Sequence, residues 1–310
     1  MMKKIVVIGS SNTDLIIKVP EIPRPGETLL GGVFMTFPGG KGANQAVAAA
    51  RAGGEVVFIA AVGDDAYGEE AINGYRQDDI NTAHIKVCKG IPSGIAMITV
   101  SEKGENAITV APGANAELRP EDLEKVEEAI HEADYMLIQL ETPLDTVLKA
   151  VELCSKLNTR VILNPAPAAE LSDGILRKVH IITPNETEAE RLTGILVSDE
   201  QTAASAADAL HERGIETVII TMGAKGAYLS DNESGARLVI PGFSVQAVDT
   251  TAAGDVFNGQ LAVSLAEGQE IKRAVVEAHG AAAISVQKLG AQSSIPRSEE
   301  TRKFIEEQYK

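Results

Sequence analysis

The chain has few of the residues that build disulfides, metal centres and aromatic surfaces. Its 310 residues include two cysteines, five histidines and no tryptophan, and aromatic residues make up 4%. Cys88 and Cys154 show neither CxxC nor metal-ligand spacing, and the histidines are scattered, which argues against a zinc hydrolase. So few cysteines, without a secretory signal, indicate a reducing cytoplasm.

The sequence also lacks a long apolar run and an excess of basic charge. The apolar stretch after Lys3 and Lys4 covers only residues 5–8, too short for a signal-peptide core, and no stretch approaches membrane-spanning length. A formal net charge of −16 argues against nucleic acid and membrane-surface partners. An acidic protein that binds a nucleotide needs local compensation from Mg²⁺, backbone N–H groups and a few lysines.

What the chain does contain is a regular alternation of β-branched runs and amphipathic stretches. Apolar content of 44% and the absence of a linker or internal repeat indicate one domain over residues 1–310. Near-continuous apolar strands are expected at 5–8, 56–62, 135–140, 161–163, 180–182 and 218–221, and helices at 43–52, 120–132, 144–157 and 202–213. This alternation predicts an α/β fold, a three-layer α/β/α sandwich around a mostly parallel central sheet.

Two regions break that alternation. Residues 15–19 with 29–37, and 94–100 with 107–110, read as strands joined by turns, with no crossover helix. We expect them to form a small β-sheet lid within about 12–38 and 94–111. The alternative is an antiparallel extension at the edge of the main sheet. A further hairpin is expected at 227–240, and helices at 271–286 and 298–309.

The most informative segment is Asp249-Thr250-Thr251-Ala252-Ala253-Gly254-Asp255, which opens a helix after an apolar strand. Free backbone N–H groups and the helix dipole attract anions there. A carboxylate in that turn suits phosphoryl transfer to a hydroxyl, because it accepts the proton of the attacking group. A capping role for Asp255 is the alternative, but the capping box would need Ser or Thr at position 252.

A second segment, Gly39-Gly40-Lys41-Gly42-Ala43-Asn44-Gln45-Ala46, fits neither the Walker nor the dinucleotide fingerprint. Its glycines let the backbone approach a polar ligand, and Lys41 and Asn44 offer donors. Asn12 and Asp14 follow the first strand, and Glu141 closes another, at the strand ends where open α/β sheets bind ligands. Together these residues suit the hydroxyls of a small polyol.

Two weaker segments also follow strands. In Thr183-Pro184-Asn185-Glu186-Thr187-Glu188, the residues Asn185 and Glu188 could orient water around Mg²⁺, or they could form an ordinary helix start with a capping acid. In Thr221-Met222-Gly223-Ala224-Lys225-Gly226, the glycines permit a tight turn beside phosphates or a ribose.

These four segments, in this order, closely resemble the ribokinase family of carbohydrate kinases, the PfkB superfamily. The resemblance runs from the first strand to about Ser294, and the segments around Lys41 and Asp255 carry its specific signatures. The wider family often has Gly where this chain has Ala252. The resemblance implies ATP-dependent phosphorylation of D-ribose at its 5-hydroxyl, and a homodimer formed through the β-lid.

The resemblance also implies a role for individual residues. Asp255 is the general base, and the N–H groups of Ala252, Ala253, Gly254 and Asp255 form an anion hole. The sugar site comprises Asn12, Asp14, Gly39, Gly40, Lys41, Asn44, Glu141 and Asp255. The nucleotide site comprises Asn185, Thr221, Gly223, Ala224, Lys225, Gly226, Gly254 and His279, with Asn185 and Glu188 near Mg²⁺ through water. A monovalent cation, commonly K⁺, is held mostly through carbonyls at Asp249, Thr251, Ser285, Lys288, Gly290 and Ser294.

Other functions compete with this interpretation. A kinase of the same fold could act on fructose, deoxyribose, a sugar phosphate or a nucleoside. The few aromatics, with Phe34 and Phe37 the lid candidates, disfavour a nucleoside, and the scarcity of basic residues beyond Lys41 and Arg24 disfavours a sugar phosphate. A non-catalytic sugar sensor would be expected to lose Asp255 or Gly254. A NAD-linked dehydrogenase lacks its fingerprint here.

Overall fold

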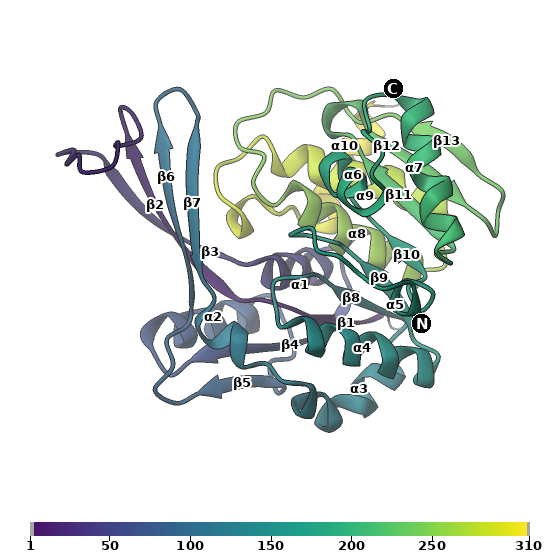
Figure 1. The fold of residues 1–310 in the computed structure, drawn as a ribbon, viewed down its shortest axis with the longest axis horizontal. Coiled ribbons are helices and arrows are strands. Elements are labelled where there is room, and N and C mark those ends of the chain that lie inside the picture. The colour runs from purple at the N-terminus through teal and green to yellow at the C-terminus, as the bar shows by residue number, and fades with distance from the viewer. Residues whose placement is uncertain (1–2, 309–310) are drawn as a thin grey trace.

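The computed structural model describes residues 3–308, which form two β-sheets and the helices that cover them (Figure 1). Within these residues the larger sheet has nine strands in the order β13-β12-β11-β10-β9-β8-β1-β4-β5. Its strands are β1 (Lys4–Ile8), β4 (Glu55–Gly63), β5 (Ile85–Cys88), β8 (Tyr135–Ile138), β9 (Arg160–Leu163), β10 (Ile181–Ile182), β11 (Thr217–Thr221), β12 (Ala227–Asp231) and β13 (Arg237–Ile240).

The larger sheet is parallel from β5 to β11, and the β12–β13 hairpin extends it in antiparallel fashion. Alternate side chains of each strand enter different cores. In β1, Ile5 and Val7 pack with α1 (Lys41–Arg51), α8 (Ala253–Ala266) and α9 (Ile271–Ser285). Val6 and Ile8 pack on the other face with α4 (Leu144–Leu157) and α7 (Glu200–Glu212). Burial on both faces explains the continuous apolar runs, and the three-layer α/β/α prediction is confirmed.

The helices expected at 43–52, 144–157, 202–213 and 271–286 lie within a few residues of observed ones, whereas the short helix α5 (Asp173–Leu176) was not expected. The helices are α1 (Lys41–Arg51), α2 (Ala66–Gln77), α3 (Glu127–Glu132), α4 (Leu144–Leu157), α5 (Asp173–Leu176), α6 (Glu186–Thr193), α7 (Glu200–Glu212), α8 (Ala253–Ala266), α9 (Ile271–Ser285) and α10 (Ser298–Gln308). Short 3₁₀ turns are η1 (Gly113–Glu117), η2 (Pro120–Val126), η3 (Gly223–Lys225) and η4 (Gln292–Ser294). No helix within residues 3–308 combines the length and apolarity needed to cross a bilayer.

Three expectations need correction. The helix expected over 120–132 is a 3₁₀ turn, η2, followed by α3, because buried Leu123 and Val126 are three residues apart and eclipse on a three-residue turn. The strand expected over 135–140 ends at Ile138, where the chain leaves the ladder. Helix α2 was not expected; Asp65 caps it by accepting a hydrogen bond from the N–H of Gly68. The last expected helical residue, Tyr309, lies outside the described residues.

The smaller sheet is separate from the main one. It contains β2 (Asn12–Val19), β3 (Val33–Gly39), β6 (Gly94–Ser101) and β7 (Asn106–Ala111) in the order β3-β2-β6-β7. β2 pairs with β3 in antiparallel and with β6 in parallel fashion, so the edge-extension alternative is wrong. In Figure 1 this small sheet projects away from the main sheet.

Helices α1 and α8 pack unusually closely on one side of the main sheet. A Cβ added to Gly259 of α8 would lie 2.5 Å from the Cβ of Ala48 and 2.7 Å from the backbone N of Ala49, both in α1. Glycine at 259 and small residues in α1 therefore set the distance between the two helix backbones. This distance matters because the main residues of the candidate site lie in the first turns of these two helices.

We predict that Gly259→Ala destabilises the fold by about 1–3 kcal/mol, because the added methyl group overpacks the α1–α8 contact. The matched control is Gly74→Ala in α2, where the added Cβ meets no atom within 4 Å. There the better helix propensity of alanine should leave stability equal or raise it by up to about 1 kcal/mol. Urea unfolding followed by circular dichroism measures both changes, and equal stabilities of the two variants would contradict the packing argument.

Candidate active site

The candidate site is centred on a buried carboxylate in the first turn of α8. Asp255 is 6% exposed, and its Oδ2 accepts a hydrogen bond from Nδ2 of Asn44 at 3.0 Å. Its Oδ1 accepts another from Nε2 of Gln45, also at 3.0 Å. Both donors open α1, so the α1–α8 contact brings them to the acid. Because Asp255 bonds to α1, the capping alternative is wrong for this residue.

The turn that carries Asp255 presents backbone donors to open space. The first helical hydrogen bond of α8 runs from the N–H of Val256 to the carbonyl of Ala252, so the N–H groups of Gly254 and Asp255 have no acceptor within the helix. A Cβ built on Gly254 meets nothing within 4 Å. Ala252 holds a left-handed conformation, φ 62°, which costs a non-glycine residue about 1 kcal/mol.

A cavity of about 200 Å³ opens at this turn. Its lining includes Lys41, Asn164, Thr183, Asn185, Glu188, Thr221, Ala252, Ala253, Gly254, Asp255 and Asn258. Segments from five separate parts of the chain thus meet where parallel strands end and helices begin. This is the position where open α/β sheets bind ligands.

The charged groups at the cavity influence one another. Burial raises the pKa of Asp255, while the charge of Lys41 and the hydrogen bonds from Asn44 and Gln45 oppose that rise. Burial alone would lower the pKa of Lys41, but the surrounding carboxylates, Asp255 and Glu141 foremost, raise it above its ordinary value. Lys41 therefore stays protonated near neutral pH and supplies positive charge to an acidic protein.

The residues expected to hold a sugar lie next to this cavity. Oε2 of Glu141 accepts hydrogen bonds from the backbone N–H of Lys41 at 3.0 Å and from Oγ of Ser10 at 2.6 Å. A Cβ on Gly39 would collide with the carboxylate of Asp14, and one on Gly40, φ 89°, would lie 2.7 Å from the backbone N of Asn12. The two glycines let the strand-end acids and the Lys41 loop come together.

Asn44 contacts Asp255 and also has a polar atom that can bind a ligand. Its Nδ2 donates to Asp255, and its buried Oδ1 has no hydrogen-bond partner among residues 3–308. A buried acceptor without a partner costs about 1–3 kcal/mol, so it suits a ligand that brings a donor, such as a hydroxyl group.

Several residues of the site were not predicted. Asn115, in η1, holds Asn12 in place: its Nδ2 donates to Oδ1 of Asn12 at 2.7 Å, while its Oδ1 accepts the N–H of Ser11 at 2.8 Å. The remaining ones are Gln45, Gln139, Asn164, Thr183 and Asn258. Gln139, Asn164 and Thr183 each directly follow a buried strand, and that position is the signal that could have identified them.

The segment around Asn185 forms a helix start. Oδ1 of Asn185 accepts the N–H of Glu188 at 2.8 Å, and Oε2 of Glu188 accepts the N–H of Asn185 at 2.9 Å, which is a complete capping box. These contacts are those of the alternative in which Asn185 and Glu188 form an ordinary helix start with a capping acid. Both residues still line the cavity, and burial raises the pKa of Glu188, with the N–H of Asn185 and the charge of Lys41 opposing that rise.

The other residues expected at a nucleotide lie further along the chain. Thr221 lines the cavity, and Gly223, Ala224 and Lys225 form η3 just beyond it. Nζ of Lys225 donates to the carbonyl of Ser198 at 3.0 Å, and Gly226, φ 103°, has no room for a side chain beside the carbonyl of Ile240.

His279, in α9, is buried against Phe257, with ring centroids 5.2 Å apart. Its Nε2 has no hydrogen-bond partner in the described chain. Burial lowers its pKa to about 4, so the ring is neutral near pH 7 and able to accept a hydrogen bond. It does not line the 200 Å³ cavity.

Two loops meet at the residues expected to hold a monovalent cation. Oδ1 of Asp249 accepts hydrogen bonds from the N–H and the hydroxyl of Thr251 at 2.9 and 2.6 Å, and Oδ2 accepts the N–H of Gly290 at 2.9 Å. Ser285, the last residue of α9, and Ser294, in η4, are both buried. The N–H of Lys288, in the loop between them, donates to the carbonyl of Ser285. Residues 3–308 contain no cluster of three or more His, Cys, Asp or Glu side chains arranged to hold a metal, and this set would bind through carbonyl and hydroxyl oxygens instead.

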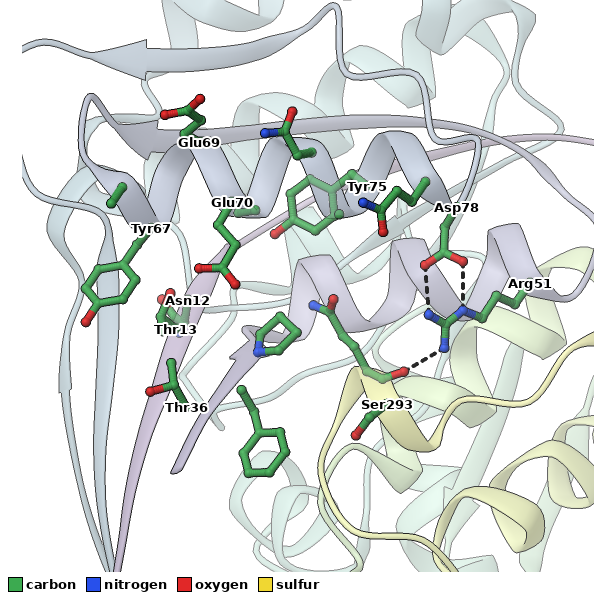
Figure 2. Close-up of a pocket in the computed structure, with 18 residues that line it drawn as sticks. Asn12, Thr13, Thr36, Arg51, Tyr67, Glu69, Glu70, Tyr75, Asp78 and Ser293 are labelled. Carbon is green, nitrogen blue, oxygen red and sulfur yellow. Dashed lines mark hydrogen bonds and ion pairs between the residues drawn. The ribbon is translucent and has the colours of Figure 1, made fainter. Parts of the chain in front are cut away.

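A second cavity, of about 810 Å³, is lined by the base of the small sheet, α2 and η4, and Asn12 is among its lining residues (Figure 2). Figure 2 shows Glu69, Glu70 and Tyr67 along α2 beside it, and the paired hydrogen bonds of Arg51 to Asp78 at its far end. Asp255 and Lys41 do not line this cavity. Although it is larger, it lacks the combination of base, cation and open helix amides found at α8.

The site combines a buried acid, a lysine and unpaired helix amides, and it lies at the strand ends of a three-layer α/β/α sandwich. This combination is typical of a phosphotransferase with the α/β architecture of sugar kinases. The model of the pfkB family carbohydrate kinases matches residues 2–298. The chain belongs to this family.

Individual relatives cover nearly the whole chain. Ribokinase of Haemophilus influenzae is 49% identical over 306 residues, 99% of each chain. Deoxyribokinase of Salmonella typhi is 38% identical over 97% of this chain and 98% of its own. The solved structure of Arabidopsis thaliana ribokinase complexed with ribose and ATP superposes with a TM-score of 0.91 at 29% identity, covering 98% of this chain and 99% of that one.

Asp14 should make stability depend on pH. Burial, together with the charge of Glu141, raises its pKa from 3.8 to about 6, so the folded chain binds a proton more tightly than the unfolded chain does. Stability should therefore fall as pH rises from about 4 to about 6. We predict that Asp14→Asn is more stable than wild type by about 1–3 kcal/mol at pH 7.5 and gains little at pH 4.

Urea unfolding at the two pH values measures this difference. The control is Asp208→Asn on the exposed face of α7, which should change stability little at either pH. A gain for Asp14→Asn that is equal at both pH values would refute the titration.

Proposed function

We propose that this chain transfers the γ-phosphoryl group of ATP to the 5-hydroxyl of D-ribose. The observation that carries this proposal is the buried carboxylate of Asp255 between open helix amides and a set of sugar-type hydrogen-bonding groups that includes Lys41 and Asn44. Family membership and 49% identity to a ribokinase support the same activity.

In the proposed mechanism, Asp255 accepts the proton of the 5-hydroxyl as that oxygen attacks the γ-phosphorus. The new O–P bond forms while the bond to the leaving ADP oxygen breaks. The N–H groups of Gly254 and Asp255, at the positive end of α8, donate to the oxygens on which charge accumulates. Asn44 and Gln45 hold the carboxylate with neutral donors, which orient it and favour its ionised form.

Sugar binding is assigned to the groups around Lys41. Asn12, Asp14, Asn44 and Glu141 offer donors and acceptors to the ribose hydroxyls, and Gly39 and Gly40 keep the backbone close to them. Asn115 occupies Oδ1 of Asn12, so the amide N–H groups of Asn12 are the part directed to a ligand. The small sheet, whose Asp14 face carries Ile16, Ile98 and Val110, would act as a lid that excludes water.

ATP is assigned to the α6, β11 and α9 side of the site. Thr221, Gly223, Ala224, Lys225, Gly226 and His279 would contact the nucleoside, and Nε2 of His279 offers a buried acceptor without a partner in the described chain. Mg²⁺ would neutralise phosphate charge, with Asn185 and Glu188 orienting its bound waters. Their capping hydrogen bonds use one oxygen of Glu188, so the other remains available.

A monovalent cation, K⁺, is assigned to the two loops that Asp249 joins. Asp249, Thr251, Lys288 and Gly290 lie on those loops, Ser285 is the last residue of α9, and Ser294 ends the 3₁₀ turn η4. Charge bound there would stabilise the strained turn at Ala252 that presents the anion-binding amides.

Deoxyribose is the second candidate substrate, because a deoxyribokinase is 38% identical to this chain. The higher identity to a ribokinase, 49%, favours ribose. A non-catalytic sugar sensor is disfavoured because Asp255 and Gly254 are both in place. Two buried free cysteines support a reducing cytoplasm as the compartment.

We predict that Asp255→Asn lowers kcat for ribose phosphorylation by about 10²–10⁴-fold, because the general base is lost while Asn44 and Gln45 still hold the side chain. ADP release measured with ribose, deoxyribose and fructose, with and without K⁺, tests substrate and cation together. Wild type should prefer ribose, and ribose binding by the variant, measured by calorimetry, should stay within about threefold of wild type.

Two results would exclude the proposal. Near-normal turnover by Asp255→Asn would remove the assigned base. Heat of ribose binding without any ADP release by the wild type would indicate a sensor instead.

We also propose that two copies associate through the outer face of the small sheet. Ile17 lies opposite Phe34, and Leu15 lies opposite Met97, so these apolar side chains share the face that does not carry Asp14. Phe34 and Met97 are 63% and 64% exposed. Thr36 on the same face also lines the 810 Å³ cavity, so this apolar face continues into that hollow and offers one surface to a second copy.

We predict that the wild type has about twice its 32.6 kDa monomer mass in light scattering, and that Phe34→Asp shifts it toward the monomer by placing a charge in the apolar interface. The control, Leu196→Asp, changes an equally exposed apolar side chain outside the small sheet and should leave the mass unchanged. A monomeric wild type would disprove the dimer without affecting the assigned chemistry.

A further inference from the structure

Gln45 is placed to control the base without touching a substrate. It is fully buried, and its Nε2 donates to Oδ1 of Asp255 at 3.0 Å and to Oδ1 of Asn164 at 3.1 Å. An amide nitrogen has two N–H groups, so both are used within the protein. Asn44 differs, because its Oδ1 has no partner in the described chain and can receive a ligand.

The orientation of the Gln45 amide is fixed from behind. Nε2 of Gln139, also fully buried, donates to Oε1 of Gln45 at 2.6 Å. A flipped Gln45 would set its oxygen against the carboxylate of Asp255 and its NH₂ against the NH₂ of Gln139. Both contacts would be repulsive, so only one orientation of the amide is compatible with its neighbours.

The same hydrogen-bond network holds the first turn of α8 from its other side. Nδ2 of Asn164 donates to the carbonyl of Thr183 at 3.2 Å, and the hydroxyl of Thr183 donates to Oδ1 of Asn258 at 2.7 Å. Nδ2 of Asn258 then donates to the carbonyl of Gly254 at 2.8 Å. Since Gln139, Asn164 and Thr183 each follow the end of a sheet strand, the rigid sheet supports both the base and its turn.

We propose that Gln45 is a positioning residue that fixes the carboxylate of Asp255 in the orientation needed to accept the sugar proton. This inference rests on the proposed role of Asp255 as general base. A neutral amide suits this task because it holds the carboxylate without contributing a charge and without titrating. A lysine or arginine in its place would stabilise the ionised form strongly and make the base weaker.

The inference predicts a change in the pH dependence as well as in the rate. The charged groups that face Asp255 are Lys41, Glu141, Asp14 and Glu188. A variant that changes none of them but removes the Gln45 donor destabilises the ionised carboxylate alone. The pKa of Asp255 should then rise, and the acidic limb of the rate profile should move to higher pH.

The experiment compares Gln45→Met, which keeps the length of the side chain without its amide, with Gln45→Glu. Single-turnover ribose phosphorylation should slow about 10–100-fold in Gln45→Met, with the KM for ribose within about threefold of wild type and the acidic limb about one pH unit higher. In Gln45→Glu the two adjacent carboxyl groups titrate as a pair, so the limb should move further.

The matched control is Gln260→Met in α8, which removes another buried amide that bonds to Ser264 rather than to the base. Its rate and pH profile should match wild type. If Gln45→Met does not fold, Gln139→Met tests the same support, because it removes the group that orients Gln45, and it should shift the limb in the same direction.

The outcomes separate the two proposals. Full turnover by Asp255→Asn would overturn the proposed function itself. A slow Asp255→Asn together with Gln45→Met, or Gln139→Met in its place, that keeps the wild-type rate and pH limb would overturn the positioning role alone. A rate loss without any movement of the limb would also overturn it, because a purely structural defect gives that result.

Discussion

The close packing of α1 against α8 is the contact on which the site depends. Helix α1 directly follows β3 of the small sheet and opens with Lys41, Asn44 and Gln45. Helix α8 follows the loop after β13 of the main sheet and opens with the turn that carries Asp255. Glycine at 259 lets the backbones approach until two amides reach the carboxylate. The sequence separation between the partners is 210 and 211 residues, so only the tertiary contact joins them.

Burial of polar groups has two uses in this chain. Desolvation raises the pKa of Asp255 and Asp14, so each carboxylate accepts a proton more readily than an exposed one would. The cost is offset by neutral amides and hydroxyls that follow the strand ends, each hydrogen-bonded to the next. Where no protein partner exists within the described chain, as at Oδ1 of Asn44, the group is suited to a ligand.

The acidic composition makes local compensation necessary. With a net charge of −16, the chain repels anions at a distance, and positive potential at the site comes from Lys41 and the amino end of α8. The carboxylates around Lys41 raise its pKa, so the lysine stays charged despite its burial. The charge interactions that matter inside the site therefore act over a few ångströms, where screening by salt is weak.

Sequence alone determined the layers, the separate small sheet and the segments around Lys41 and Asp255, because apolar periodicity and glycine placement are local properties. It could not decide between capping and ligand roles at Asn185, since both use the same residue types, whereas at Asp255 the alanine at position 252 already argued against a capping box. The tertiary structure shows that Asp255 accepts hydrogen bonds from side chains of α1, and that Asn185 forms a capping box with Glu188. It also revealed Gln45, Gln139 and Asn115, because hydrogen bonds between distant residues follow from packing and leave no local pattern.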